Sequence, residues 1–271
     1  MTPLARAFEN LQRENRCGFI PFLVAGDPDL QTTPELIAAL TRSGATAIEV
    51  GVPFSDPTAD GSVIQRAAQR ALNRATTLAA IFQMLHQLRS TNETPLVLFS
   101  YYNPILQFGL RKFADDAARC GVGGVLVTDL PPEAAEPLRA LLSERAIDLI
   151  FLVAPTTSDA RLQQIAKLAS GFIYAIARTG VTGTHRELVD ESATLVQRIR
   201  SVSTLPVAVG FGITKRAQVK TVCAYADAAV VGSRLVAEIE EATASAKWRR
   251  AELIERVERC ARQFGSVRRS L

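Results

Sequence analysis

The stretch PVAVGFGITKRAQVKTVCAYADAAVVGS, residues 206–233, contains the repeating unit that decides the fold. It begins with the apolar run 206–209, passes through a glycine-bearing loop at 210–213 and continues as a helical pattern over 215–223. A second apolar run at 228–231 ends in another glycine. Because both runs are continuously apolar and a crossover helix fits between them, they are predicted to be buried, parallel strands.

The same unit recurs along the chain, in which apolar runs alternate with helical patterns. The predicted strands are 19–24, 47–50, 96–100, 124–127, 149–153, 172–176, 206–209 and 228–231. The predicted helices are 3–14, 34–43, 67–74, 78–89, 111–120, 133–145, 159–169, 190–202, 215–223 and 234–244. This series predicts a closed (β/α)₈ barrel, the TIM barrel of the α/β class. An open doubly wound sheet is the alternative, but its G-x-G-x-x-G fingerprint is absent after the first strand.

No glycine- or serine-rich linker interrupts the series, so residues 1–271 are predicted to form one domain. The barrel core spans about 18–245, and a helical C-terminal extension covers about 246–271. Between residues 247 and 269, arginines and glutamates stand at helical spacing, which predicts one helix with paired surface charges. The interleaved aromatic residues of a nucleic-acid platform are missing there, so nucleic acid is not an expected partner.

The composition excludes several classes of protein. With 48% hydrophobic residues, and 31 Lys and Arg against 27 Asp and Glu, the chain is neither disordered nor collagen-like. The cysteines stand singly and without metal-ligand spacing, which favours free thiols and no metal site. The first 16 residues lack the apolar core of a secretory signal, and no run approaches the roughly 20 apolar residues of a membrane span. A soluble cytoplasmic protein is therefore expected, without membrane partners.

The stretch 48–61 holds the first predicted part of an active site, because catalytic side chains of such barrels lie at the carboxyl ends of the strands. Strand alternation sends Glu49 into the barrel mouth. Partial desolvation there is expected to raise the pKa of its carboxyl group and to suit it for general acid–base catalysis. The loop that follows carries Asp56 and Asp60, both in ordinary turn sequences. The pattern alone does not choose between these two aspartates.

Glycines follow the last three predicted strands and form the second predicted part of the site. They stand in Thr182-Gly183, in Gly210-Phe211-Gly212 and in Gly232-Ser233. At such positions backbone N–H groups can approach an anion, and the N-terminus of the following helix favours negative charge. The substrate is therefore expected to carry a phosphate group.

The residues that are missing from the strands narrow the chemistry. All lysines fall in helical segments or at their starts, so no strand lysine is available for a Schiff base. The two histidines, His86 and His185, do not make a metal site. Carboxylate acid–base catalysis on a phosphorylated substrate remains. Tyr174, on an apolar strand, is either a participant or a packing residue.

From about residue 18 to residue 233 the sequence resembles the tryptophan synthase α subunit family. The resemblance is carried by motifs in a fixed order: FLVAGDP (22–28), EVGVPFSDPTADG (49–61), YYNP (101–104), DLP (129–131), FLVAPT (151–156), RTGVTG (178–183) and GFGI (210–213). It implies a (β/α)₈ barrel that cleaves indole-3-glycerol phosphate to indole and glyceraldehyde 3-phosphate by a retro-aldol step, without a cofactor of its own.

The resemblance also implies the roles of individual residues. Glu49 protonates the indole ring at C3, Asp60 rather than Asp56 stabilises the charge that develops at the indole N–H, and Tyr174 is the active-site tyrosine. The implied substrate-binding residues are Phe22, Phe99, Val127, Val153, Thr182 and Phe211. The implied phosphate-binding residues are Gly183, Gly212, Gly232 and Ser233. The sequence departs from the family pattern at Ser62, where proline is usual, and at Ala175, where an aromatic residue is common.

A partner follows from the same resemblance: the pyridoxal-phosphate-dependent β subunit, in an α₂β₂ heterotetramer that receives the indole. The implied contact residues are Asp56, Pro57, Tyr102 and Asn103. Three alternatives remain open at this point. The chain could be a stand-alone indole-3-glycerol-phosphate lyase, another phosphate-binding barrel isomerase without a β partner, or an activating subunit without chemistry of its own.

Overall fold

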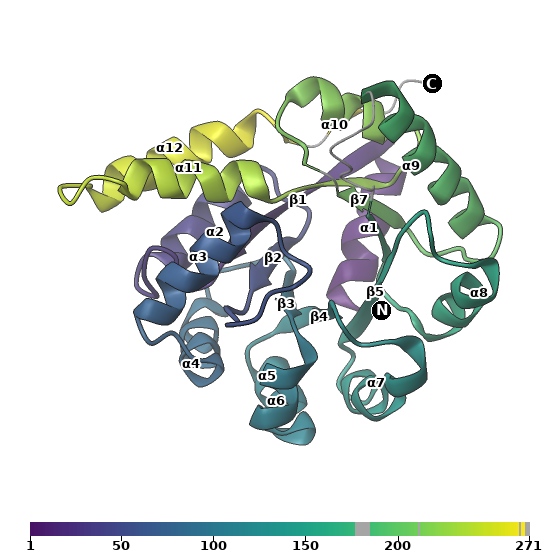
Figure 1. The fold of residues 1–271 in the computed structure, drawn as a ribbon, viewed down its shortest axis with the longest axis horizontal. Helices are drawn as coiled ribbons and strands as arrows, with labels where there is room; N and C mark the ends of the chain where they lie inside the picture. The colour runs from purple at the N-terminus through teal and green to yellow at the C-terminus, as the bar shows by residue number, and fades with distance from the viewer. Residues whose placement is uncertain (177–184, 211, 266, 269–271) are drawn as a thin grey trace.

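A closed barrel of eight parallel strands forms the centre of the molecule (Figure 1). The computed structural model describes residues 1–176, 185–210, 212–265 and 267–268. The strands are β1 (Arg16–Val24), β2 (Ile48–Gly51), β3 (Leu96–Ser100), β4 (Val122–Val127), β5 (Asp148–Val153), β6 (Ile173–Ile176), β7 (Val207–Gly210) and β8 (Ala228–Val231). Each strand pairs with the next along the chain, and β1 pairs with both β8 and β2. The predicted TIM barrel is thereby confirmed, and the open sheet is wrong.

Helices surround this barrel. They are α1 (Pro3–Arg13), α2 (Thr33–Arg42), α3 (Ser62–Asn73), α4 (Leu78–Leu88), α5 (Tyr102–Phe108), α6 (Leu110–Arg119), α7 (Glu136–Ser143), α8 (Asp159–Leu168), α9 (His185–Arg200), α10 (Arg216–Cys223), α11 (Ser233–Thr243) and α12 (Arg250–Arg262). A short 3₁₀ helix, η1 (Pro132–Ala134), precedes α7. A short strand, β9 (Val267–Arg268), pairs antiparallel with the start of β1.

Four differences from the predicted helices are the largest. Helix α9 begins at His185, five residues before its predicted start. Helix α3 begins at Ser62, five residues before the predicted start, so it follows directly on the 52–61 loop. Helix α5 is absent from the predicted series, and it contains Pro104 near its start. Proline is tolerated in the first turn of a helix, where its missing N–H would have no partner. The predicted helix of the extension ends at Arg262, and β9 follows it.

Alternation along the strands separates two packing layers. Residues such as Val50, Val127 and Val209 belong to the core between strands and helices. Their strand neighbours fill the barrel itself, where Ile20, Val97, Leu126, Ile150, Phe172 and Val230 form a second core.

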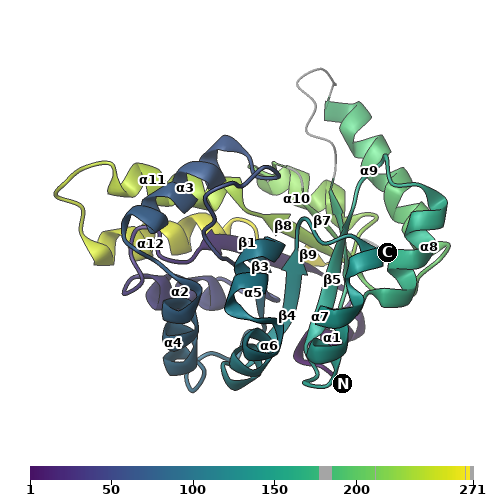
Figure 2. The same ribbon diagram turned by 60° about the horizontal axis from the view of Figure 1, so that its bottom comes forward.

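Helix α1 closes one end of the barrel. Its Leu4 and Phe8 are buried and belong to the core inside the barrel. In Figure 2 the N-terminus and α1 lie at the bottom of the view, whereas α3 lies at the top. The open end of the barrel is therefore the one to which the carboxyl ends of the strands point.

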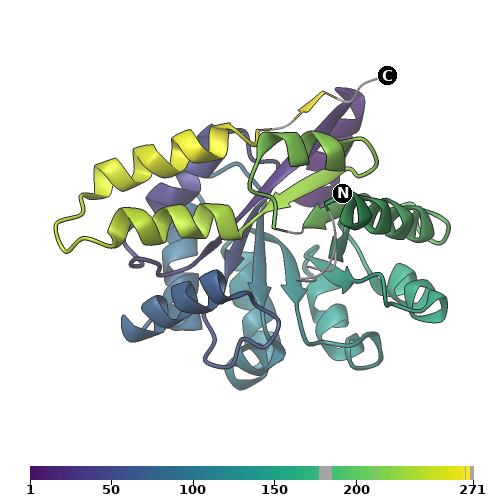
Figure 3. The ribbon, with the colours of Figure 1, turned by 45° about the horizontal axis from the view of Figure 1, so that its top comes forward.

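The C-terminal extension packs as a second layer outside the barrel. Figure 3 shows α11 and α12 side by side, and α12 also contacts α2. Its charged residues pair across helices: Arg42 of α2 binds Glu258 of α12, and Arg256 of α12 binds Glu238 of α11. The paired charges predicted for this segment thus join three helices rather than lying only along one helix.

Two of the cysteines pair, contrary to the expectation of free thiols. Cys17 on β1 and Cys223 at the end of α10 form a disulfide with a Cα–Cα distance of 5.5 Å. They stand 206 residues apart in sequence, and only the closure of the barrel brings them together. Cys120 and Cys260 are buried and free. None of the helices in the described part of the chain is both long and apolar enough to cross a bilayer.

Candidate active site

The register of the strands brings three predicted site residues to the inside of the barrel. Phe22 of β1 stands beside Glu49 of β2, and Gly51 of β2 stands beside Phe99 of β3. The rings of Phe22 and Phe99 meet edge to face, with centroids 5.3 Å apart. A Cβ atom at residue 51 would lie 2.7 Å from the Phe22 ring, so the glycine makes room for this aromatic pair. The pair forms an apolar wall next to the carboxyl group of Glu49.

Glu49 is a buried acid without a neutralising partner among the described residues. Its exposed fraction is 1%, and its Oε1 has no hydrogen-bond partner in the described part of the chain. Burial raises the pKa of Glu49 to about 8, because the charged form loses its hydration. The carboxyl group is therefore protonated at neutral pH and can donate a proton to a substrate.

Tyr174 of β6 faces the same interior space. A Cβ atom at residue 210 on the neighbouring strand would lie 2.3 Å from the Tyr174 hydroxyl, so Gly210 makes room for the phenol. Burial, and after it the nearby charge of Glu49, raises the pKa of Tyr174 well above its ordinary value. The hydroxyl group is thus a neutral hydrogen-bond donor close to Glu49.

Asp60 and Asp56 differ in their environments. Asp60 is half-buried, and burial raises its pKa to about 6 against the opposing effect of a hydrogen bond from the Tyr101 hydroxyl. Asp56 is exposed and accepts a hydrogen bond from the neighbouring Ser55. Of the two aspartates, Asp60 is the one whose carboxyl group is half-buried and hydrogen-bonded, and with a pKa of about 6 it is ionised at neutral pH.

Tyr101 is a site residue that the sequence analysis did not single out. Its exposed fraction is 3%, and its hydroxyl accepts the backbone N–H of Ala59 at 2.9 Å while bonding the Asp60 carboxylate. The ring of Phe54 packs against it with centroids 5.1 Å apart. Its position could have signalled it, because Tyr101 directly follows the carboxyl end of β3, where site residues of such barrels lie.

Val127 and Val153 lie elsewhere than expected. Both belong to the core between strands and helices, whereas Leu126 and Leu152 on the same strands contact the core inside the barrel. The expectation that the two valines line the apolar pocket is therefore wrong by one position. Because side chains alternate along a strand, a shift of one residue moves a side chain to the other face.

The predicted phosphate site is described in part. Gly232 follows β8, which ends at Val231, and immediately precedes α11, whose first residue is Ser233. Gly212 is exposed, with a positive φ of 48° that favours glycine, and a Cβ atom there would meet open space. Gly183 lies outside the described residues, as do Thr182 and Phe211.

The residues predicted to meet a partner lie in the loop after β2 and at the start of α5, at the same end of the barrel. Asp56 and Asn103 are exposed, while Pro57 and Tyr102 are partly exposed. The backbone N–H of Tyr102 donates to Asp129 at 2.7 Å, which ties the start of α5 to the loop after β4.

A cavity of about 580 Å³ opens at the opposite end of the barrel. It lies against α1, and Gly171, Pro206 and Asp227, which precede β6, β7 and β8, are part of its lining. None of the predicted site residues lines it. It therefore belongs to the amino ends of the strands, away from Glu49.

Comparisons with known proteins point to one family. The family model described as Tryptophan synthase alpha chain matches residues 8–264. The tryptophan synthase alpha chain of Geotalea uraniireducens (strain Rf4) is 47% identical over 241 residues, which cover 89% of this chain and 90% of that relative. That of Solibacter usitatus (strain Ellin6076) is 46% identical over 246 residues, covering 91% and 92%.

Solved structures agree with the sequence comparisons. Tryptophan synthase subunit alpha from Legionella pneumophila str. Paris superposes with a TM-score of 0.87 at 35% identity, covering 97% of this chain and 98% of that one. A chain of the tryptophan synthase complex from Pyrococcus furiosus superposes with a TM-score of 0.81 at 36% identity, covering 91% and 97%.

Proposed function

The chain belongs to the tryptophan synthase alpha chain family, and we propose which of its residues carry out the reaction of that family. It is a lyase of tryptophan biosynthesis that catalyses the α reaction, the retro-aldol cleavage of indole-3-glycerol phosphate to indole and glyceraldehyde 3-phosphate. The observation that carries the assignment of residues is the buried, protonated Glu49 at the mouth of the barrel, next to an aromatic wall.

Glu49 is the proposed acid and base. Its carboxyl group donates a proton to C3 of the indole, which makes the ring able to accept the electron pair of the breaking carbon–carbon bond. The carboxylate that remains accepts the proton of the glycerol hydroxyl as the aldehyde forms, so the group ends protonated as it began. Asp60, as a carboxylate, accepts a hydrogen bond from the indole N–H and stabilises the positive charge on the ring. The hydroxyl group of Tyr174 acts as a neutral hydrogen-bond donor close to Glu49.

The remaining substrate contacts divide between an apolar and a phosphate end. Phe22 and Phe99 contact the indole ring, and Leu126 and Leu152 take the place first assigned to Val127 and Val153. Thr182 and Phe211 stay predictions for the same pocket. The phosphate lies against backbone N–H groups at Gly183, Gly212, Gly232 and Ser233, where the N-terminus of α11 favours an anion.

The proposed assembly is an α₂β₂ heterotetramer with the tryptophan synthase β subunit. The support is twofold. A similar chain comes from a structure described as the tryptophan synthase complex from Pyrococcus furiosus. The loop with Asp56 and Pro57 and the start of α5 with Tyr102 and Asn103 reach the surface at the active-site end. Pyridoxal phosphate would be the β subunit's, and this chain would use no cofactor. Residues 1–271 would form one domain, with the extension as an added layer, and the family's biosynthetic role favours the cytoplasm.

The test is direct release of indole from indole-3-glycerol phosphate by the purified chain, with and without β subunit. Glu49→Gln keeps the shape of the side chain and removes the transferable proton, so kcat is expected to fall by about 10²- to 10⁴-fold while glycerol phosphate still binds. The same substitution at the exposed Glu93 serves as the control and should leave kcat unchanged. Near-normal turnover by Glu49→Gln would show that another group carries the proton.

A further inference from the structure

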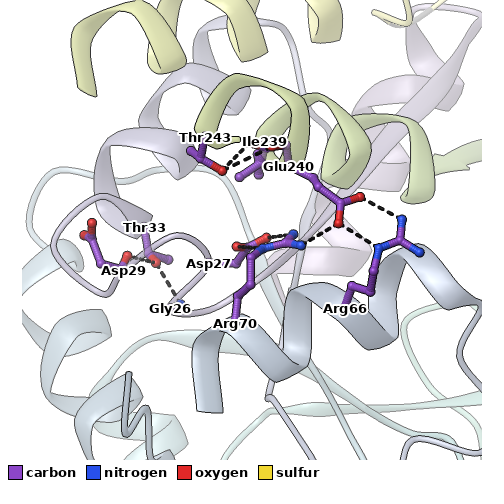
Figure 4. Close-up of polar contacts among 9 residues, drawn as sticks. All are labelled: Gly26, Asp27, Asp29, Thr33, Arg66, Arg70, Ile239, Glu240 and Thr243. Atoms are coloured by element: carbon purple, nitrogen blue, oxygen red, sulfur yellow. Dashed lines mark hydrogen bonds and ion pairs between the residues drawn. The ribbon is translucent and has the colours of Figure 1, made fainter. Parts of the chain in front are cut away.

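A chain of alternating charges joins three elements around the mouth of the barrel (Figure 4). Arg70 of α3 donates from Nε and Nη2 to the two carboxylate oxygens of Asp27, at 2.8 and 2.9 Å. Its third nitrogen, Nη1, donates to Glu240 of α11 at 2.8 Å. Arg66, one turn earlier on α3, binds the same glutamate through two hydrogen bonds of 2.7 Å. Asp27 belongs to the loop after β1, so Arg70 links that loop, α3 and α11.

The series of ion pairs is buried at its Asp27 end and exposed to water at its Arg66 end. Asp27 is fully buried, and burial raises its pKa even though the hydrogen bonds from Arg70 oppose the shift. The side chain of Arg66 is 53% exposed, and its hydrogen bonds are the main cause that lowers the pKa of Glu240 to about 2. A buried carboxylate that loses its partner is strongly disfavoured, whereas an exposed pair contributes little. Arg70 is therefore the residue on which this series of ion pairs depends.

Two of the three linked elements carry the two ends of the proposed site: α3 follows the loop with Asp60, and α11 begins at the phosphate end. Helix α3 begins at Ser62, two residues after Asp60. Helix α11 begins at Ser233, at the phosphate end, and Glu240 lies two turns further along it. Beside the charges, a small apolar cluster packs the same elements together: Phe22 and Val24 of β1, Ala67 and Ala71 of α3, and Val236 of α11.

We propose that Arg70 is a positioning residue of the active site, which holds α3 against α11 and so keeps Asp60 at a set distance from the phosphate end. The inference rests on the proposed function, because it assigns Arg70 a role through Asp60. A helix moves as a stiff body, and Asp60 stands only two residues before α3. A shift of α3 relative to α11 therefore also moves Asp60. The substrate must meet both ends at once, whereas phosphate alone meets only one of them.

Lysine cannot replace Arg70 in this arrangement. A guanidinium group presents a planar fork that fits one carboxylate with two hydrogen bonds and still reaches a second one, as Arg70 does. An ammonium group is a point charge, which can neutralise Asp27 but cannot hold the angle between the loop and α11. Arg70→Lys thus keeps the positive charge but removes the planar fork that binds Asp27 and Glu240 at once.

The experiment compares Arg70→Lys with the matched control Arg66→Lys, which lies on the same helix and binds the same Glu240. Circular dichroism first establishes the folded fraction at 25 °C. Steady-state indole release then gives kcat and KM, and titration calorimetry gives the Kd of glycerol 3-phosphate. For Arg70→Lys we expect kcat per folded molecule to fall about 10- to 100-fold, with the Kd of glycerol 3-phosphate within about twofold of wild type. For Arg66→Lys both values should stay within about twofold.

The outcomes separate the two claims. A folded Arg70→Lys protein with a wild-type kcat, whatever its melting temperature, refutes the positioning role and leaves the proposed function standing. Wild-type protein that releases no indole refutes the proposed function itself. If Arg70→Lys does not fold, Glu240→Ala gives the same comparison, because it removes the contact of α11 with Arg70 and keeps Arg70 bound to Asp27. An unchanged kcat in that variant also refutes the role.

Discussion

Replacing Glu49 by glutamine is expected to stabilise the protein at high pH while it removes activity. Burial raises the pKa of Glu49 from 4.5 to about 8. Between these values the unfolded chain has released the proton that the folded chain still holds, so the free energy of unfolding falls as pH rises, by about 1.36 kcal/mol per pH unit. Over the whole interval this amounts to about 5 kcal/mol. The stabilising contribution is fully present below pH 4.5 and is lost as pH rises through 8. Glutamine has no proton to lose and escapes this change.

The measurement is urea unfolding of wild type and Glu49→Gln at pH 5 and at pH 8.5. The difference in unfolding free energy between the two proteins should shift in favour of the variant by about 3–5 kcal/mol between the two pH values. Glu93→Gln, at an exposed position, provides the control and should show the same difference from wild type at both pH values. If the Glu49→Gln difference is equally insensitive to pH, Glu49 is not held protonated by burial, and the basis for its role as an acid disappears.

Three further predictions concern the same site. The pH profile of kcat/KM should be bell-shaped, with activity gained as Asp60 ionises near pH 6 and lost as Glu49 ionises near pH 8; a flat profile between pH 5 and 9 contradicts the assignment. Tyr101→Phe removes a hydrogen bond that lowers the pKa of Asp60, so the acidic limb should move to higher pH, and an unmoved limb means that the bond does not act on Asp60. Gly212→Val should weaken the binding of glycerol phosphate about 5- to 30-fold, because a residue with a side chain loses roughly 1–2 kcal/mol at positive φ. Crowding is not the cause, since the new Cβ would meet open space. An unchanged Kd in calorimetry argues against a phosphate at this loop.

The strands were predictable because a parallel barrel buries both faces of each strand. Such strands appear as short continuous apolar runs, and all eight predicted runs became barrel strands with ends within three residues of those expected. Helix ends were less predictable, because caps and tertiary contacts decide them. Helix α5, with Pro104 near its start, and the end of α12 before β9 are the clearest examples.

A site residue was predictable where the inward and outward directions of neighbouring side chains along its strand are clear from their polarity. The inward direction of Glu49 follows from its place between two outward-facing apolar residues of β2. The resemblance implies Val127 and Val153, but these belong to the core outside the barrel, and Leu126 and Leu152 are the inward residues of β4 and β5. The strand register distinguishes the two faces, because each inward residue stands beside another inward residue on the next strand.

Sequence alone determined the class of fold, the acid at the mouth and the family, because these depend on local periodicity and on motifs in a fixed order. The tertiary structure alone decided what depends on distant segments meeting: the pairing of Cys17 with Cys223, the bond from Tyr101 to Asp60 and the link from Asp27 through Arg70 to Glu240. Desolvation is the physical reason for the difference. The pKa of a carboxyl group, and the strength of an ion pair, are set by how completely the surrounding elements exclude water, and that exclusion exists only once the barrel has closed.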